Sequence, residues 1–147
     1  MIKIISVGDS DKHFDKAIFE YQKRLGKSVE LIPIKPVKGE SIENTIKFET
    51  KKILDKLKKY PNFHKIILNK SGKLVDSHYF SQFFPGNNNT AFILGGPYGL
   101  NTSLLYPSIQ QEISFGKITL PHGIAKLVLL EQLYRGYTIS INKSYHY

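Results

Sequence analysis

Two histidines and one arginine of this 147-residue chain could take part in proton transfer or anion binding. His122 stands between a proline and a glycine, and His146 is the penultimate residue. An imidazole can accept a proton near neutral pH because its ordinary pKa lies there. Arg135 is one of only two arginines, and its planar guanidinium suits phosphate binding better than a lysine ammonium does.

Each of these side chains also has a structural interpretation. His122 could cap the start of a helix, and His146 could be a disordered terminal residue. Arg135 could form an ion pair with Glu131, which lies four residues earlier on the same helical face. At this point both interpretations stay open for all three residues.

A glycine-rich loop follows an apolar segment at residues 92–100, FILGGPYGL. Gly95, Gly96 and Gly99 let the main chain approach a flat ligand or adopt a positive φ, and they leave backbone donors free. A tight turn without a ligand is the alternative. The loop matches neither the phosphate-binding pattern GxxxxGK[ST] nor the dinucleotide pattern GxGxxG, and the chain lacks the hydrolase pattern GxSxG.

Composition excludes some sites and favours an anionic partner. The chain has no cysteine, and its five histidines lack the spacing of a metal site, so we expect no metal. The net charge of +9 favours an anion such as RNA, although 19 of the 21 basic residues are lysines and compositional bias is the alternative. The apolar start of the chain is too short for a secretory signal, so we expect a cytoplasmic protein without a membrane segment.

Hydrophobic periodicity predicts alternating strands and helices. The expected strands span residues 2–8, 29–37, 64–69, 90–94 and 113–120, and the expected helices span residues 14–25, 41–60, 76–84, a short stretch from 101 to 107, and 125–137. Ser10 or Asp11 is expected to cap the first helix, and two prolines place the second strand at a sheet edge.

This alternation is typical of an α/β protein with a mostly parallel sheet, here as one domain over residues 1–147. Ligands of such sheets sit outside the carboxyl ends of the strands. The loops at residues 68–72, 95–99 and 116–121 lie at such ends and are the expected ligand-binding loops. The lysine-rich face of residues 47–59 is expected to be solvated, with contact to an RNA backbone as the less favoured alternative.

Three segments together resemble the RlmH family of SPOUT methyltransferases. They are LGGPYGL, ITLPHGIAKLVLLEQLYRGYTI and the terminal NKSYHY, and the resemblance covers essentially the whole chain. It implies an α/β fold with a C-terminal trefoil knot, a homodimer, and S-adenosylmethionine as the cofactor. It also implies methyl transfer to N3 of a pseudouridine in 23S ribosomal RNA, within the 70S ribosome.

The resemblance also assigns residues. It implies cofactor contacts at Leu68, Gly95 and Gly96 and along Gly116, Lys117, Ile118, Thr119, Leu120 and Pro121. It favours a role at the substrate for Arg135, for His122 as a base, and for His146 in positioning. Two departures stand out: Tyr98 occupies a position that is often acidic in relatives, and the chain stops at Tyr147, where relatives continue with a basic residue that Lys143 could replace.

Two other functions remain as alternatives. A non-catalytic ribosome-binding factor could keep the fold and the basic surface without the reaction. A methyltransferase acting on another RNA site or on a small molecule could share the cofactor loops, because function resides in sites rather than in folds.

Overall fold

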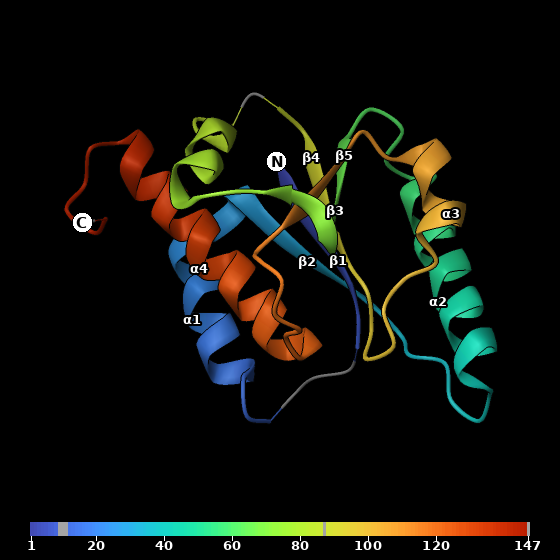
Figure 1. The fold of residues 1–147 in the computed structure, drawn as a ribbon. Coiled ribbons are helices and arrows are strands. Elements are labelled where there is room, and N and C mark those ends of the chain that lie inside the picture. Colours follow the sequence, from blue (N-terminus) through green and yellow to red (C-terminus); the bar gives the residue numbers. More distant parts are fainter. Residues whose placement is uncertain (9–11, 87, 147) are drawn as a thin grey trace.

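The computed structural model describes residues 1–8, 12–86 and 88–146, so the expected caps Ser10 and Asp11 lie outside the described residues. A parallel sheet forms the middle layer, with helices on both of its faces (Figure 1). The elements are β1 (Ile2–Val7), α1 (Asp15–Leu25), η1 (Gly26–Ser28), β2 (Val29–Ile34), α2 (Ile42–Leu57), β3 (His64–Leu74), η2 (Ser77–Phe83), β4 (Thr90–Leu94), α3 (Thr102–Leu105), η3 (Tyr106–Ser108), β5 (Gln111–Ser114) and α4 (His122–Ser140), where η marks a 3-10 helix.

The strand order is β2-β1-β4-β3-β5, and each neighbouring pair is parallel. Phe92 of β4 lies opposite both Ile4 of β1 and Ile66 of β3, at the centre of the sheet. β2 lies at an edge, as its prolines predicted. The predicted α/β architecture with a parallel sheet is thus confirmed, while the trefoil knot stays a prediction.

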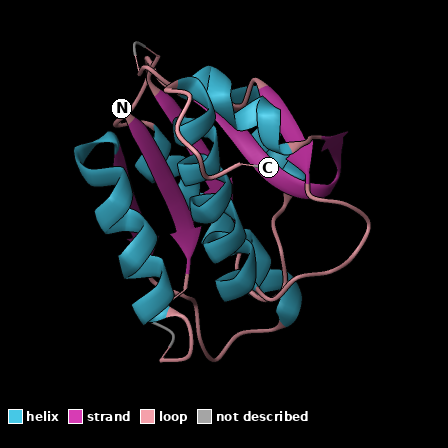
Figure 2. Ribbon diagram, turned by 90° about the vertical axis from the view of Figure 1, so that its left-hand side faces the viewer, coloured by secondary structure: helices cyan, strands magenta, loops and turns pink. Residues whose placement is uncertain are grey.

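Alternating strand residues supply two separate cores. On one face, Ile4 and Phe92 pack with α1, η2 and α4, and on the other Ile5 and Ile93 pack with α2 and α3. Figure 1 shows the sheet between these helices, and Figure 2, turned by 90°, looks onto the side that α1 and α4 cover. Because both faces are covered, the strands are nearly continuous apolar runs, and β1 and β4 therefore lie close to their predicted bounds, whereas β2 ends at Ile34 rather than at residue 37.

Two predicted boundaries at the end of the sheet are wrong. β5 covers only residues 111–114, not 113–120, because Gly116 turns with φ of 126° and breaks the strand. β3 does not stop at residue 69 but continues to Leu74 after an irregularity in which Leu68 and Lys73 both lie opposite Ile113. Residues 69–72 therefore bulge out of the ladder.

Two helical predictions also need correction. Residues 77–83 form a 3-10 helix rather than an α-helix, capped by the Asp76 carboxylate, which accepts a hydrogen bond from Tyr79 N. The last helix runs from His122 to Ser140, longer at both ends than predicted. Among the described residues, no helix is both long and apolar enough to cross a membrane.

α4 packs against α1 and η2, and its backbone comes close to that of η2 at Gly136. A Cβ at this position would lie 2.5 Å from the Phe80 carbonyl carbon and 2.6 Å from its oxygen. Backbone atoms cannot rotate away as a side chain can. Gly136 therefore permits the contact that covers one face of the sheet.

We predict that Gly136→Ala destabilises the fold by about 2 kcal/mol, because the overpacking cost exceeds the gain in helix propensity. Urea unfolding followed by circular dichroism measures this. Gly86→Ala is the control, since a Cβ there meets no atom nearer than 3.8 Å. Equal stability of Gly136→Ala and wild type would contradict the close packing of α4 on η2.

Candidate functional site

The carboxyl ends of the strands meet at one edge of the sheet, where the chain encloses a pocket of about 670 Å³. All three predicted loops contribute to it. Its lining comprises Leu68, Asn69, Lys70, Leu94, Gly95, Gly96, Pro97, Tyr98, Gly99, Leu100, Thr102, Ser114, Phe115, Gly116, Ile118, Thr119, Leu120, Pro121, His122 and Ala125. Every predicted cofactor-binding residue except Lys117, which is exposed, lines this pocket.

The glycine-rich loop after β4 is a tight turn that also forms one wall of the pocket. Gly99 N donates to Gly96 O over 3.0 Å, and Gly99 has φ of 85°. A Cβ on Gly95 would lie 2.9 Å from the carbonyl carbon of Gly99. The turn itself therefore requires glycine at residues 95 and 99, whether or not a ligand lies against the loop.

A buried carboxylate lies behind this loop. Glu49 of α2 is only 1% exposed, and its Oε2 accepts a hydrogen bond from Val37 N over 2.9 Å. Its Oε1 has no hydrogen-bond partner among the described residues and lies 3.0 Å from where a Cβ of Gly96 would stand. Val7 Cγ1 would be 3.1 Å from the same Cβ. Glu49 and Val7 therefore hold the rear of the loop and leave no room for a side chain there.

Hydrogen bonds at Gly116 and at Thr119 hold the loop after β5. Ser114 Oγ bonds both the nitrogen and the oxygen of Gly116, at 3.0 and 2.9 Å. Lys70 Nζ donates to Thr119 Oγ1 over 2.8 Å. The bulge of β3 thus reaches across to the loop that the resemblance assigns to the cofactor.

The bulge itself rests on Glu112 of β5. Glu112 Oε1 accepts hydrogen bonds from Asn69 Nδ2 at 2.7 Å and from Ser71 Oγ at 3.0 Å. Gly72 permits the close approach of the two strands, because a Cβ there would lie 2.6 Å from backbone atoms of Ile113. These contacts present Asn69 and Lys70 to the pocket.

His122 lies where sequence reasoning placed it, beside the cofactor loop. It is the first residue of α4 and lines the pocket, and its imidazole carbon and nitrogen lie 3.1 Å from where a Cβ of Gly8 would stand. The N-cap of α4 is Pro121, and no side chain provides a capping hydrogen bond. The capping role considered for His122 is therefore wrong.

Arg135 does not line this pocket and makes the ion pair that its spacing allowed. Its Nη2 donates to Glu131 Oε1 over 2.7 Å, and the guanidinium lies 4.9 Å from the ring centre of Tyr145. The hydrogen bond that Arg135 donates to Glu131 raises the pKa of Arg135 above its ordinary value. Burial and the hydrogen bond with Tyr21 raise the pKa of Tyr145, whose hydroxyl donates to Glu131 over 3.2 Å.

His146 belongs to the tail that follows α4 and turns back beside it, so that Tyr145 reaches Glu131. The ring of His146 lies 4.9 Å from that of His78. Its Nδ1 is buried and has no hydrogen-bond partner in the described part of the chain. The 19 residues of α4 span about 28 Å at 1.5 Å per residue. One chain therefore brings His122, but neither Arg135 nor His146, to the pocket.

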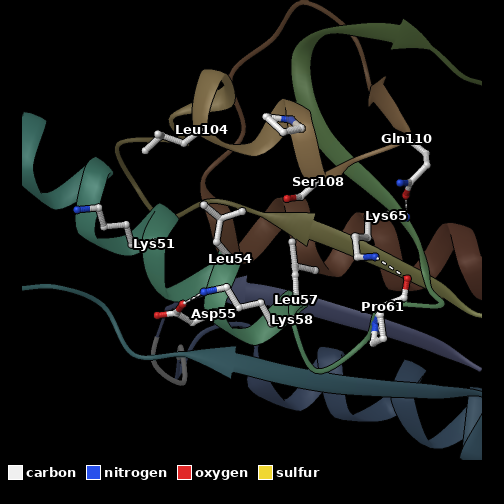
Figure 3. A pocket seen from close by; sticks show the side chains of 11 residues that line it. Lys51, Leu54, Asp55, Leu57, Lys58, Pro61, Lys65, Leu104, Ser108 and Gln110 are labelled. Carbon is white, nitrogen blue, oxygen red and sulfur yellow. Dashed lines mark hydrogen bonds and ion pairs between the residues drawn. The ribbon is translucent and has the colours of Figure 1, made fainter.

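A second hollow of about 650 Å³ lies between α2 and the segment of α3 and η3 (Figure 3). Lys65 and Gln110, near the amino ends of β3 and β5, also line it, so it lies away from the carboxyl ends of the strands. Two of its three lysines are already engaged by the protein: Lys58 Nζ lies 3.0 Å from Asp55 Oδ1, and Lys65 Nζ donates to the carbonyls of Pro61 and Phe63. It also lacks glycine-rich walls. We therefore assign the functional site to the pocket at the carboxyl ends of the strands.

The sequence placed Lys70 within an expected ligand-binding loop but did not single it out as a site residue. The motif Lys-Ser-Gly-Lys at residues 70–73 indicated a loop, and a bulge was not considered. A glycine between lysines at the end of a buried strand was the available signal. No group of three or more acidic or histidine side chains in the described ranges could hold a metal ion.

We predict that Gly96→Ala destabilises the protein by about 1–3 kcal/mol, because the new methyl would contact Glu49 and Val7. Urea unfolding of this variant, compared with Pro97→Ala at the adjacent exposed position, measures the effect. If Gly96→Ala is as stable as wild type, the loop does not need its close packing against α2 and β1.

Comparison with known proteins assigns the chain to a family. Residues 1–146 match the family described as "Predicted SPOUT methyltransferase". Curated proteins named ribosomal RNA large subunit methyltransferase H match it over nearly their full length. The one from Mesomycoplasma hyopneumoniae strain 7448 is 38% identical, covering 99% of this chain and 97% of the relative, and the one from Pseudothermotoga lettingae is 32% identical, covering 99% of both.

Solved structures share the fold. A Bacillus anthracis protein assigned to the RNA methyltransferases aligns over 100% of both chains with a TM-score of 0.63 at 12% identity. A methylase family protein from Haemophilus influenzae Rd KW20 aligns with a TM-score of 0.62 at 12% identity, over 99% of this chain and 70% of that one. Together, the full-length family match and the identity to its curated relatives show that the chain belongs to the SPOUT methyltransferase family.

Proposed function

We propose that the chain methylates N3 of a pseudouridine in 23S ribosomal RNA, with S-adenosylmethionine as the methyl donor and the assembled 70S ribosome as the substrate. The observation that carries this proposal is the pocket, which gathers the three loops that the resemblance assigns to the cofactor. The curated relatives, named for the same reaction class, support the RNA target. We further propose that the chain is one domain over residues 1–147 and that it acts in the cytoplasm, where its ribosomal substrate would be.

The pocket fits S-adenosylmethionine in size and chemistry. Its volume of about 670 Å³ lies in the range of small-molecule sites. Leu68, Leu94, Leu100 and Phe115 offer apolar surface for a flat ring, and glycines expose backbone donors and acceptors. No aspartate or glutamate lies among the described lining residues, so no acidic side chain repels a ligand carboxylate.

The reaction needs alignment and a proton acceptor from the protein. When bound, the cofactor supplies an activated methyl group on a sulfonium. The pocket walls would exclude water and hold N3 in line with that methyl group. His122, at the pocket wall, would accept the N3 proton as the N3–methyl bond forms, because a neutral imidazole is a base near physiological pH.

A homodimer would complete the site. Arg135 lies about 20 Å from His122 along α4, and His146 packs against His78, outside the pocket lining, so a single copy does not bring them together. A two-fold dimer that packs α4 against its partner would place the tail of one copy near the pocket of the other. Arg135 would then bind RNA phosphate, and His146 would position the substrate.

The experiment is methyl transfer from labelled S-adenosylmethionine to ribosomes that lack the modification, followed by mass spectrometry of the digested nucleosides. We expect N3-methylated pseudouridine. Label in a different nucleoside would keep the reaction class and overturn the target. Tight ribosome binding without any label would favour the non-catalytic ribosome-binding factor.

The composite site makes a separate prediction about mixed dimers. His122→Gln removes the proton acceptor from the pocket, and His146→Ala removes a contact from the tail, so each homodimer should lose most of its activity. A heterodimer, co-expressed with two tags and purified by both, should regain about half of the wild-type rate, because one of its two sites is intact. Activity no higher than that of the two parents would show that each copy works alone.

A further inference from the structure

Lys70 is the one permanently charged side chain among the described residues that line the pocket. It lies on the bulge of β3, outside the loops around Gly96 and Gly116 that the resemblance assigns to the cofactor backbone contacts. Its place is fixed by two independent contacts. Glu112 holds the neighbouring Asn69 and Ser71, and the Lys70 ammonium itself donates to Thr119 Oγ1 over 2.8 Å.

The Lys70 ammonium has N–H groups left to donate to a ligand. A lysine carries three N–H groups, and Thr119 accepts one of them. Within the described part of the chain, neither an ion pair nor another acceptor engages Lys70. The cation is therefore held at the pocket wall by a neutral hydroxyl, without a carboxylate to compensate its charge.

The proposed ligand has a matching group. S-adenosylmethionine carries one carboxylate, at the end of its amino acid part, and the remaining pocket wall consists of apolar side chains, glycines and neutral polar groups. A carboxylate that leaves water needs charged or multiple donors. We infer that Lys70 binds the carboxylate of the cofactor's amino acid part and thereby fixes the orientation of the donor. This inference rests on the proposed function.

The test is a calorimetric titration with two ligands. Lys70→Met should bind S-adenosylmethionine about threefold to fivefold more weakly than wild type, because a charged contact is lost at an exposed position. 5′-Methylthioadenosine lacks the amino acid part, so its affinity should be the same for both proteins. Lys73→Met is the matched control, since Lys73 lies on the same strand, carries the same charge and does not line the pocket.

The other outcomes are distinguishable. Equal weakening for both ligands would overturn the inference and show that Lys70 acts through the loop by holding Thr119. Unchanged cofactor affinity with weaker binding of ribosomes would also overturn it, in favour of an RNA phosphate as the partner of Lys70. Wild-type protein that binds neither ligand would instead overturn the proposed function itself.

Discussion

The parallel pairing of β1, β4 and β3 is the constraint on which the site depends. These strands share one register across the centre of the sheet, with Phe92 opposite both Ile4 and Ile66. Because parallel strands end at the same edge, the loops that follow β3 and β4 must emerge together. β5 pairs with β3 in the same direction and adds the third loop. The pocket is thus a consequence of strand direction before any side chain in it is considered.

Packing behind the loops then gives the pocket its shape. Glu49 and Val7 support the glycine-rich turn from one face of the sheet, while Glu112 supports the bulge of β3. The bulge in turn reaches the loop after β5 through Lys70 and Thr119. Each wall is therefore held by residues that lie outside the pocket or at its margin, which is the arrangement expected of a preorganised binding site.

The helix that begins at the pocket also leads away from it. α4 starts with His122 and continues past Arg135, where Glu131 and Tyr145 engage the guanidinium. The tail after α4 folds back beside the helix and places His146 against His78, outside the pocket that His122 lines. This geometry separates the proposed base from the proposed substrate contacts, and it is the structural reason for proposing that two copies share each site.

Much of this arrangement could be predicted from the sequence, and the failures have physical causes. The buried strands β1 and β4 were located closely because their apolar runs have no other interpretation in an α/β protein. The segment Ile113–Leu120 also looked like a strand, but the positive φ of Gly116 and the hydrogen bonds of Ser114 turn it into a loop. The bulge at residues 69–72 depends on a close approach to Ile113, which no local pattern reveals.

The residues that line the pocket could be predicted where strand ends determine them, but not where distant contacts do. The segments 68–72, 95–99 and 116–121 all reach the pocket, as the rule for parallel sheets indicates from the ends of strands, while their role in ligand binding stays a prediction. The separation of Arg135 from His122 follows from the helix predicted over residues 125–137, whereas the position of His146 was not predicted, since it depends on how the tail after α4 folds. A motif shows which residues belong together in a family, but not whether one chain or two must supply them.

The most direct measurement of the central claim is hydrogen exchange of the wild-type protein with and without S-adenosylmethionine. Amides protected by the ligand should lie in residues 68–72, 95–100 and 116–122, where the three loops enclose the pocket. Exchange around the second hollow, at residues 51–65, should not change. Protection confined to that hollow, or no protection at saturating ligand, would contradict the assignment of the cofactor to the carboxyl ends of the strands.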